Sequence, residues 1–204
     1  MNSKFISKKR LELSIIFALI FTILISVSHF EAACEDMKSN VLRLHIIANS
    51  DSKEDQALKL LVRDAILEKC DYLFNANTDI EEAVTIAQNS LADFNSVANE
   101  VIREKGFEYL AESTVGMSYF ETRVYDNFTL PAGEYKSLII KLGKGGGKNW
   151  WCVVFPSVCL PTAYADIEDS VSAESGRIAK QPQNYVMRFK IVEIYEEIKN
   201  FIKK

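Results

Sequence analysis

Residues 41–68 read VLRLHIIANSDSKEDQALKLLVRDAILE, and this stretch decides how the rest of the chain is interpreted. Its beginning, 41–47, is mostly apolar and β-branched, which indicates a largely buried strand. The small polar residues Ala48–Asp51 favour a turn, because such side chains bond their own backbone. Ser52 stands three residues before Asp55, as a helix N-cap does. Apolar residues then recur at helical spacing. The stretch therefore predicts a strand that turns directly into an amphipathic helix.

The later part of the chain predicts further strands and two more helices. Apolar residues keep helical spacing over 79–105 and again over about 186–202. Between these helices the pattern changes to short runs rich in β-branched and aromatic residues, joined by brief turns. The predicted strands are 115–125 (one or two strands), 128–130, 135–142 and 150–155. Short connections between successive strands indicate an antiparallel meander.

These elements predict an α+β domain. We expect an antiparallel or mixed sheet that includes strand 41–47 and is covered by three amphipathic helices, at 52–73, 79–105 and 186–202. Residues 161–184 show no clear strand pattern and are interpreted as a loop or a weak helix.

A targeting segment is predicted before this domain. Residues 4–10 carry four positive charges, and residues 13–27 are uncharged and strongly apolar, which is typical of a signal peptide or a membrane anchor. Small residues before His29 would permit cleavage there; the alternative is an uncleaved anchor that holds the domain outside the membrane. We therefore expect a signal peptide or membrane anchor over 1–35 and one domain over 36–204.

Charge and cysteine content limit the function classes. The chain has a net charge of −4, and its N-terminal segment holds a surplus of basic residues, so the remaining domain is more acidic still. Nucleic-acid binding is not expected, because it needs clustered Lys and Arg. Cys152 and Cys159 flank a segment that could bring them together in a disulfide outside the cytoplasm, although spacing alone does not establish this bond. No cysteine or histidine pair has metal-ligand spacing, and neither a metal nor a cofactor is expected.

The sequence contains no convincing catalytic set. The glycine-rich loop 143–148 lacks the spacing of a phosphate-binding loop, and no nucleophile elbow or zinc-protease motif is present. His45 is interpreted as a hydrogen-bonded structural residue near the end of its strand. An enzyme centred on His45 or Cys152 remains the alternative from a different functional class.

Two groups of residues are candidates for contact with a protein partner. Polar residues gather around the junction of strand 41–47 with its helix, where they form either a recognition surface or an internal network. Adjacent tryptophans on a strand point to opposite faces, so one of them is expected to be partly exposed and to act as an interface anchor. The candidate partner-binding residues are Arg43, His45, Asn49, Asp51, Lys59, Arg63, Asn149, Trp150 and Trp151.

Three segments of the chain also resemble a known family. The string RLHIIANSDSKEDQALKLLVRDAIL, at 43–67, is similar to the N-terminal signature of the stage II sporulation protein R family. LPAGEY at 130–135 and GKNWWCVVFP at 147–156, with Cys159 after it, resemble the middle and third motifs of that family. The three segments follow in the family's order over roughly residues 41–160.

The resemblance implies a function that the residues alone do not. Members of this family are made in the forespore and exported into the space between the forespore and mother-cell membranes. There they activate a membrane-embedded aspartic protease of the mother cell, which processes the sigma-E precursor. The resemblance thus implies an intercellular signalling protein rather than an enzyme, with that protease as its partner. The membrane is expected to be contacted through the N-terminal segment. The resemblance supplies no active-site residues.

Overall fold

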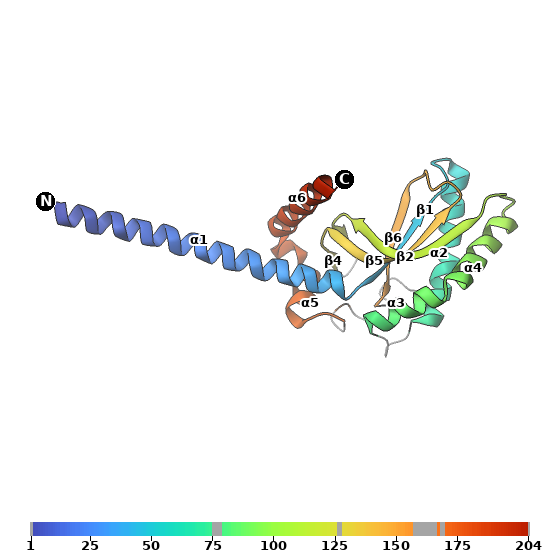
Figure 1. Ribbon diagram of the computed structural model, residues 1–204, viewed down its shortest axis with the longest axis horizontal. Helices are drawn as coiled ribbons and strands as arrows, with labels where there is room; N and C mark the ends of the chain where they lie inside the picture. Colours follow the sequence, from blue (N-terminus) through green and yellow to red (C-terminus); the bar gives the residue numbers. More distant parts are fainter. Residues whose placement is uncertain (1, 75–78, 126–127, 157–166, 168–169, 204) are drawn as a thin grey trace.

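The computed structural model describes residues 2–74, 79–125, 128–156, 167 and 170–203 (Figure 1). The helices are α1 (Asn2–Ser39), α2 (Lys53–Leu73), α3 (Ile80–Asn89), α4 (Leu91–Glu104), α5 (Ala173–Lys180) and α6 (Val186–Lys203), with a short 3-10 turn at Pro182–Asn184. The strands are β1 (Leu42–Ile47), β2 (Ala111–Phe120), β3 (Arg123–Val124), β4 (Thr129–Leu130), β5 (Gly133–Leu142) and β6 (Asn149–Phe155). The chain is α+β, as predicted.

The main sheet is mixed, with the strand order β2-β5-β1-β6. β1 runs parallel to β5 and antiparallel to β6, whereas β2 and β5 are antiparallel. The predicted meander is wrong at this point, because β5 and β6 flank β1 instead of pairing with each other. β1 carries Leu42, Leu44 and Ile46, which are all 0% exposed, and a position between two strands buries such an apolar strand most completely.

The two faces of the sheet contact different sets of helices. Leu42, Leu44 and Ile46 face α2, α3 and α4 in one core. The opposite face forms a second core with the last turns of α1, the β3–β4 hairpin, α5 and α6. Predicted helices 52–73 and 186–202 are present, but 79–105 is two helices divided at Ser90. Serine beside asparagine is a poor continuation of a helix, since both side chains compete for backbone hydrogen bonds. Helix α5 lies within 161–184, which we interpreted as a loop or a weak helix.

Helix α1 is both a candidate membrane span and part of the domain. Its segment Lys9–Ser39 is long and apolar enough to cross a membrane, and the most apolar part of this segment is not buried against the rest of the protein. The helix projects far from the sheet in Figure 1. Its last turns nevertheless place Phe30, Cys34 and Met37 in the second core, each 3% exposed or less. The fold therefore uses residues before the predicted boundary at 35, and that boundary stays a prediction.

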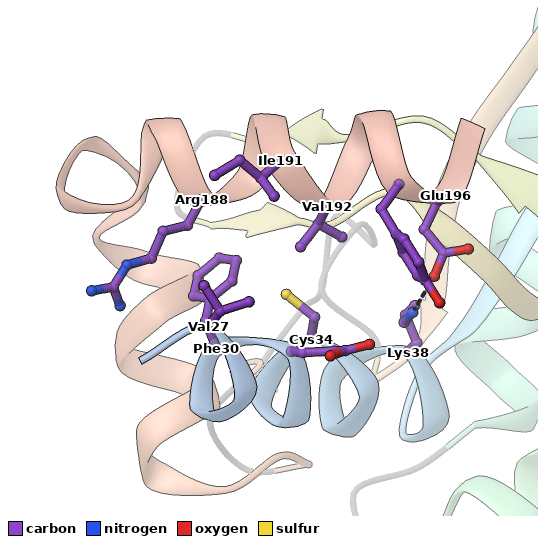
Figure 2. Close-up of a pocket in the computed structure, with 10 residues that line it drawn as sticks. Val27, Phe30, Cys34, Lys38, Arg188, Ile191, Val192 and Glu196 are labelled. Carbon is purple, nitrogen blue, oxygen red and sulfur yellow. Dashed lines mark hydrogen bonds and ion pairs between the residues drawn. The ribbon is translucent and has the colours of Figure 1, made fainter. Parts of the chain in front are cut away.

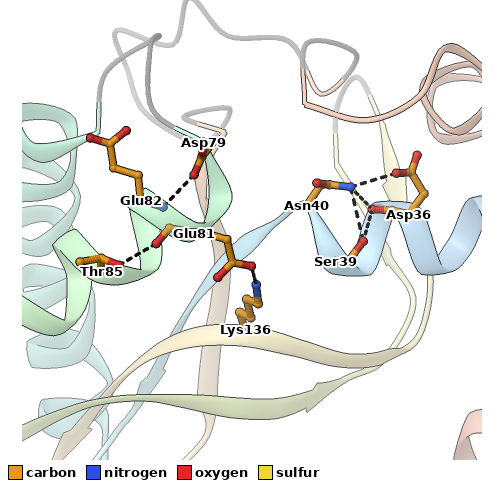
Figure 3. Close-up of polar contacts among 8 residues, drawn as sticks. All are labelled: Asp36, Ser39, Asn40, Asp79, Glu81, Glu82, Thr85 and Lys136. Carbon is orange, nitrogen blue, oxygen red and sulfur yellow. Dashed lines mark hydrogen bonds and ion pairs between the residues drawn. The ribbon is translucent and has the colours of Figure 1, made fainter.

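Side-chain hydrogen bonds fix where two helices begin and end (Figure 3). Asn40 donates to the backbone oxygen and a carboxylate oxygen of Asp36, both at 2.9 Å, where α1 ends. Asp79 accepts from the backbone N–H of Glu82 at 2.8 Å and so caps α3. Glu81, in the first turn of α3, forms an ion pair with Lys136 of β5. These contacts satisfy polar groups at the end of α1 and at the start of α3, and they link α3 to β5.

Candidate partner-binding site

Three of the predicted site residues join the turn between β1 and α2 to the loop between β5 and β6. The side-chain oxygen of Asn49 accepts from the backbone N–H of Lys144 at 3.0 Å, and a carboxylate oxygen of Asp51 accepts from that of Lys148 at 2.7 Å. The ammonium of Lys59 donates to the backbone oxygen of Lys148 at 2.9 Å. Their polar groups are engaged within the protein, as in the internal-network alternative. Direct contact of these three residues with a partner stays a prediction.

Asp55 is the centre of this network. Its side chain accepts hydrogen bonds from Ser50 Oγ at 2.5 Å, Asn49 Nδ2 at 2.9 Å and the Tyr109 hydroxyl at 2.5 Å, while its backbone N–H donates to the N-cap Ser52. Burial acts to raise the pKa of Asp55, but the hydrogen bonds outweigh it and the pKa is lowered. The carboxylate is therefore ionised at neutral pH and fixes the strand–helix junction.

The β5–β6 loop approaches the junction so closely that one position admits only glycine. A Cβ atom on Gly147 would lie 2.2 Å from the backbone oxygen of Ser50, a distance that atoms in proteins do not tolerate. The backbone N–H of Gly147 donates to the backbone oxygen of Ala48 at 2.9 Å. The sequence of this loop invited a phosphate-binding interpretation. In the structure, Gly147 instead allows the loop to pack against the β1–α2 turn.

Arg43, His45 and Trp151 lie on the face of the sheet opposite α2–α4, and several of their nitrogen atoms lack hydrogen-bond partners among the described residues. Arg43 is 0% exposed, and its Nη2 donates to the hydroxyl of Tyr125 at 2.6 Å. Its guanidinium carbon lies 3.8 Å from the ring centroid of Phe120 and 4.8 Å from that of Tyr135. Among the described residues, no hydrogen-bond partner exists for Arg43 Nε and Nη1, for either ring nitrogen of His45 or for Trp151 Nε1.

Burial dominates the electrostatics of this group. It lowers the pKa of Arg43; the Tyr125 and Tyr135 hydroxyls act in the opposite direction, and the charge of Arg123 lowers it further. Burial also lowers the pKa of His45, with Asn149 opposing and Arg43 reinforcing the shift. His45 is therefore neutral at pH 7. The guanidinium of Arg43 remains charged because arginine holds its proton even when buried.

The two tryptophans point to opposite faces, as expected. Trp150 packs against the core formed with α2–α4, and its ring centroid lies 5.2 Å from the guanidinium carbon of Arg63. Arg63 also pairs with Asp64 at 2.7 Å. Trp151 packs against the second core beside His45. Both tryptophans are half-buried, so each of them is partly exposed, whereas we expected this of one.

A cavity of about 280 Å³ opens at the start of β6, and we call it the hairpin cavity. It is lined by Arg123, Val124, Tyr125, Asn149, Trp150 and Trp151. The guanidinium carbon of Arg123 lies 4.2 Å from the Trp151 ring centroid, and Arg123 Nε has no hydrogen-bond partner in the described part of the chain. Sequence reasoning missed Arg123 and Tyr125, although a basic residue inside an aromatic β-rich run was a signal.

A second cavity, of about 250 Å³, lies between the end of α1 and α6 (Figure 2). Its walls are mostly apolar and include Phe30 and Cys34 of α1 and Val192 of α6. The Lys38–Glu196 ion pair, at 3.0 Å and with both side chains almost fully buried, closes one end. This cavity lies where the candidate membrane span meets the domain.

The cysteines and the acidic groups limit the chemistry available. Cys152 is disulfide-bonded, whereas Cys34 and Cys70 are free and buried. The other predicted disulfide residue, Cys159, lies outside the described residues, so its bond to Cys152 stays a prediction. A disulfide-bonded Cys152 has no thiol to act as a nucleophile. Within the described ranges, no three His, Cys, Asp or Glu residues are placed to hold a metal ion.

Comparison with known proteins identifies the family. Residues 38–165 match the family model described as Stage II sporulation protein R. The chain belongs to the stage II sporulation protein R family. A segment of 119 residues is 39% identical to Stage II sporulation protein R of Bacillus subtilis (strain 168) and covers 58% of this chain and 53% of that protein. The match thus spans about half the length of the curated relative. No solved structure matches this chain.

The stage II sporulation protein R match covers only part of the architecture. It includes β1 to β6 and the helices α2, α3 and α4, and therefore the whole hairpin cavity. The apolar part of α1 and the helices α5 and α6 lie outside it. The family region thus coincides with the sheet, the α2–α4 layer and the unpartnered polar group at Arg43.

Proposed function

We propose that this protein is an extracytoplasmic signal of endospore formation. In this proposal it is exported from the forespore into the intermembrane space, where it activates a membrane-embedded aspartic protease that processes the sigma-E precursor. The observation that carries the proposal is the match of residues 38–165 to a sporulation family. Helix α1 supports it, since an apolar N-terminal helix fits a signal or a membrane anchor.

The proposed mechanism is a shift between two states of the protease. A ligand moves an equilibrium only by its difference in affinity for the two states. A preference of about 3 kcal/mol for the active state, roughly two factors of ten, would be enough for a switch. The sheet domain offers half-buried tryptophans beside a cavity, the kind of surface on which protein partners anchor.

No observation favours the enzyme alternative. Cys152 lacks a free thiol, and among the described residues no hydroxyl or thiol is hydrogen-bonded to His45, so a nucleophile–base pair is not assembled there. The role proposed here therefore requires binding alone.

Processing of the precursor in a reconstituted host tests the proposal. Cells would produce the protease and the sigma-E precursor, together with the full chain, with a chain that lacks residues 1–28, or with neither form. We expect cleaved precursor only with the full chain, because the domain must cross the membrane to meet its partner. Equal cleavage with the shortened chain retained in the cytoplasm would contradict the topology. Absence of cleavage despite confirmed production of all three proteins would refute the signalling role.

A further inference from the structure

The face of the sheet that bears Arg43 carries a buried positive charge with no matching negative one. Arg43 is the largest side chain that is completely buried in the described structure. Buried charges are normally paired, because removal from water penalises the charged form heavily. Within the described ranges, the neighbours of the guanidinium are the Phe120 and Tyr135 rings and the Tyr125 hydroxyl, and it forms no ion pair. No negative charge among the described residues therefore compensates it.

The hydrogen-bond donors around Arg43 are also unsatisfied. Trp151 Nε1 and Arg123 Nε are buried atoms, and neither has a hydrogen-bond partner among the described residues. Both donate only and cannot satisfy each other. A native fold rarely leaves several buried donors unpaired in one place, and such a group calls for an explanation. An acceptor that bears a negative charge would satisfy these donors and compensate Arg43 together.

The hairpin cavity lies beside these donors. Arg123 and Trp151 line it, although Arg123 Nε and Trp151 Nε1 are themselves buried. Tyr125 lines it as well and accepts the hydrogen bond of Arg43, so the buried charge is connected to the cavity through one hydroxyl. Arg123 has one weak competitor, since its contact with Glu121 is 3.7 Å long and both side chains are substantially exposed. An exposed ion pair of this kind contributes little free energy, so Arg123 can exchange Glu121 for another carboxylate at little cost.

We propose that the hairpin cavity binds a carboxylate side chain of a protein partner, held by Arg123 and Trp151 Nε1 and attracted by the charge of Arg43. The planar fork of Arg123 matches the two oxygens of a carboxylate. The aromatic walls suit the apolar part of an acidic side chain, and a volume of about 280 Å³ admits it. This inference rests on the proposed function, in which the partner is the outward-facing part of the protease.

The position of the cavity favours a protein over a membrane lipid as the source of the anion. Asn149, at the cavity, pairs with Ile47, which is the last residue of β1. β1 starts at Leu42, just after α1, so the cavity lies at the end of the strand that is remote from α1. The apolar part of α1, which a bilayer would hold, precedes the opposite end of β1. A local basic site on a chain with a net charge of −4 would also direct an acidic group to one place.

Intrinsic fluorescence provides the direct test, because both tryptophans of the chain line this cavity. The full chain in mild detergent would be titrated with N-acetyl-aspartate amide, with its uncharged analogue N-acetyl-asparagine amide and with inorganic phosphate. We expect a saturable change with the aspartate probe and at least tenfold weaker binding of the asparagine probe. Equal responses to these two probes would overturn the proposal. Tighter binding of phosphate would overturn the assignment to a carboxylate.

Matched arginine variants locate the site and separate it from the function. Arg123→Gln should weaken binding of the aspartate probe at least tenfold, whereas Arg103→Gln, at an exposed position of α4, should bind as the wild type does. In the processing assay, Arg123→Gln should reduce cleavage of the precursor at least tenfold at equal protein level, and Arg103→Gln should not. If Arg123→Gln abolishes probe binding but supports normal processing, the protease is not the source of the carboxylate. If the wild-type chain triggers no processing, the proposed function fails, while the titration still decides whether the cavity binds a carboxylate.

Discussion

Replacement of Arg43 by methionine is expected to stabilise the fold and to weaken carboxylate binding. The side chain is 0% exposed and leaves Nε and Nη1 unpaired, and each unsatisfied buried donor costs about 1–3 kcal/mol. Methionine removes that cost and fills similar space. It also removes the hydrogen bond to Tyr125, about 1 kcal/mol, and the contact with the Phe120 ring, about 2 kcal/mol. With the desolvated charge removed as well, the net gain should be about 1–3 kcal/mol, comparable to replacements of buried ion pairs.

Urea denaturation of the full chain in mild detergent, followed by circular dichroism at 25 °C, measures this free energy of unfolding. The midpoint should rise while the slope with urea stays unchanged, since the surface exposed on unfolding is nearly the same. Arg63→Met is the matched control, because Arg63 contacts Trp150 on the opposite face and is partly exposed. Its effect should remain within about 0.5 kcal/mol. A loss of more than about 1 kcal/mol in Arg43→Met would show that the native fold already compensates the charge, and the reasoning would fail.

Two further predictions concern the strand–helix junction. Asp55→Asn should cost about 1–3 kcal/mol, because Asp55 accepts hydrogen bonds from three side chains. The pKa of Asp55 is lowered in the folded state, so its stabilising contribution is present above about pH 4 and is lost as the pH falls further. Urea midpoints from pH 3 to pH 7 should therefore vary less in this variant than in the wild type; an unchanged profile would refute the assignment. Gly147→Ala should cost about 1–3 kcal/mol in the same assay, since its Cβ would meet Ser50 at 2.2 Å. At Gly116 the nearest atom would be 3.9 Å away, so Gly116→Ala should be nearly neutral, and equal losses in both variants would contradict the close approach.

Carboxylate binding at the hairpin cavity, as proposed, would explain why the fold retains a residue that we predict to be destabilising. Natural proteins break local rules of packing and polar satisfaction mainly at functional sites, where the cost is offset elsewhere. A variant that is more stable but binds the carboxylate less well would place Arg43 in that class. The network at Asp55 is the opposite case, because its donors and acceptors satisfy one another within the protein.

The sequence by itself determined the features that depend on neighbouring residues. The apolar run of 13–27, the strand β1, the Ser52 cap and the helix that follows it depend on periodicity and hydrogen bonds within a few positions. The motifs also pointed to the family. Local patterns could not place β1 between β5 and β6, because the apolar runs are similar and the choice depends on which arrangement buries β1 best.

Only the tertiary structure decided which candidate residues form hydrogen bonds within the protein and which lie near the hairpin cavity. Asn49, Asp51 and Lys59 are joined to a loop far along the chain, since the hydrogen bond from Lys59 to Lys148 spans 89 positions. The bond between Arg43 and Tyr125 spans 82, and it connects a buried arginine to a cavity that no single segment contains. Contacts of this range form only once the chain has folded, and folding is driven by burial of apolar surface across the whole domain.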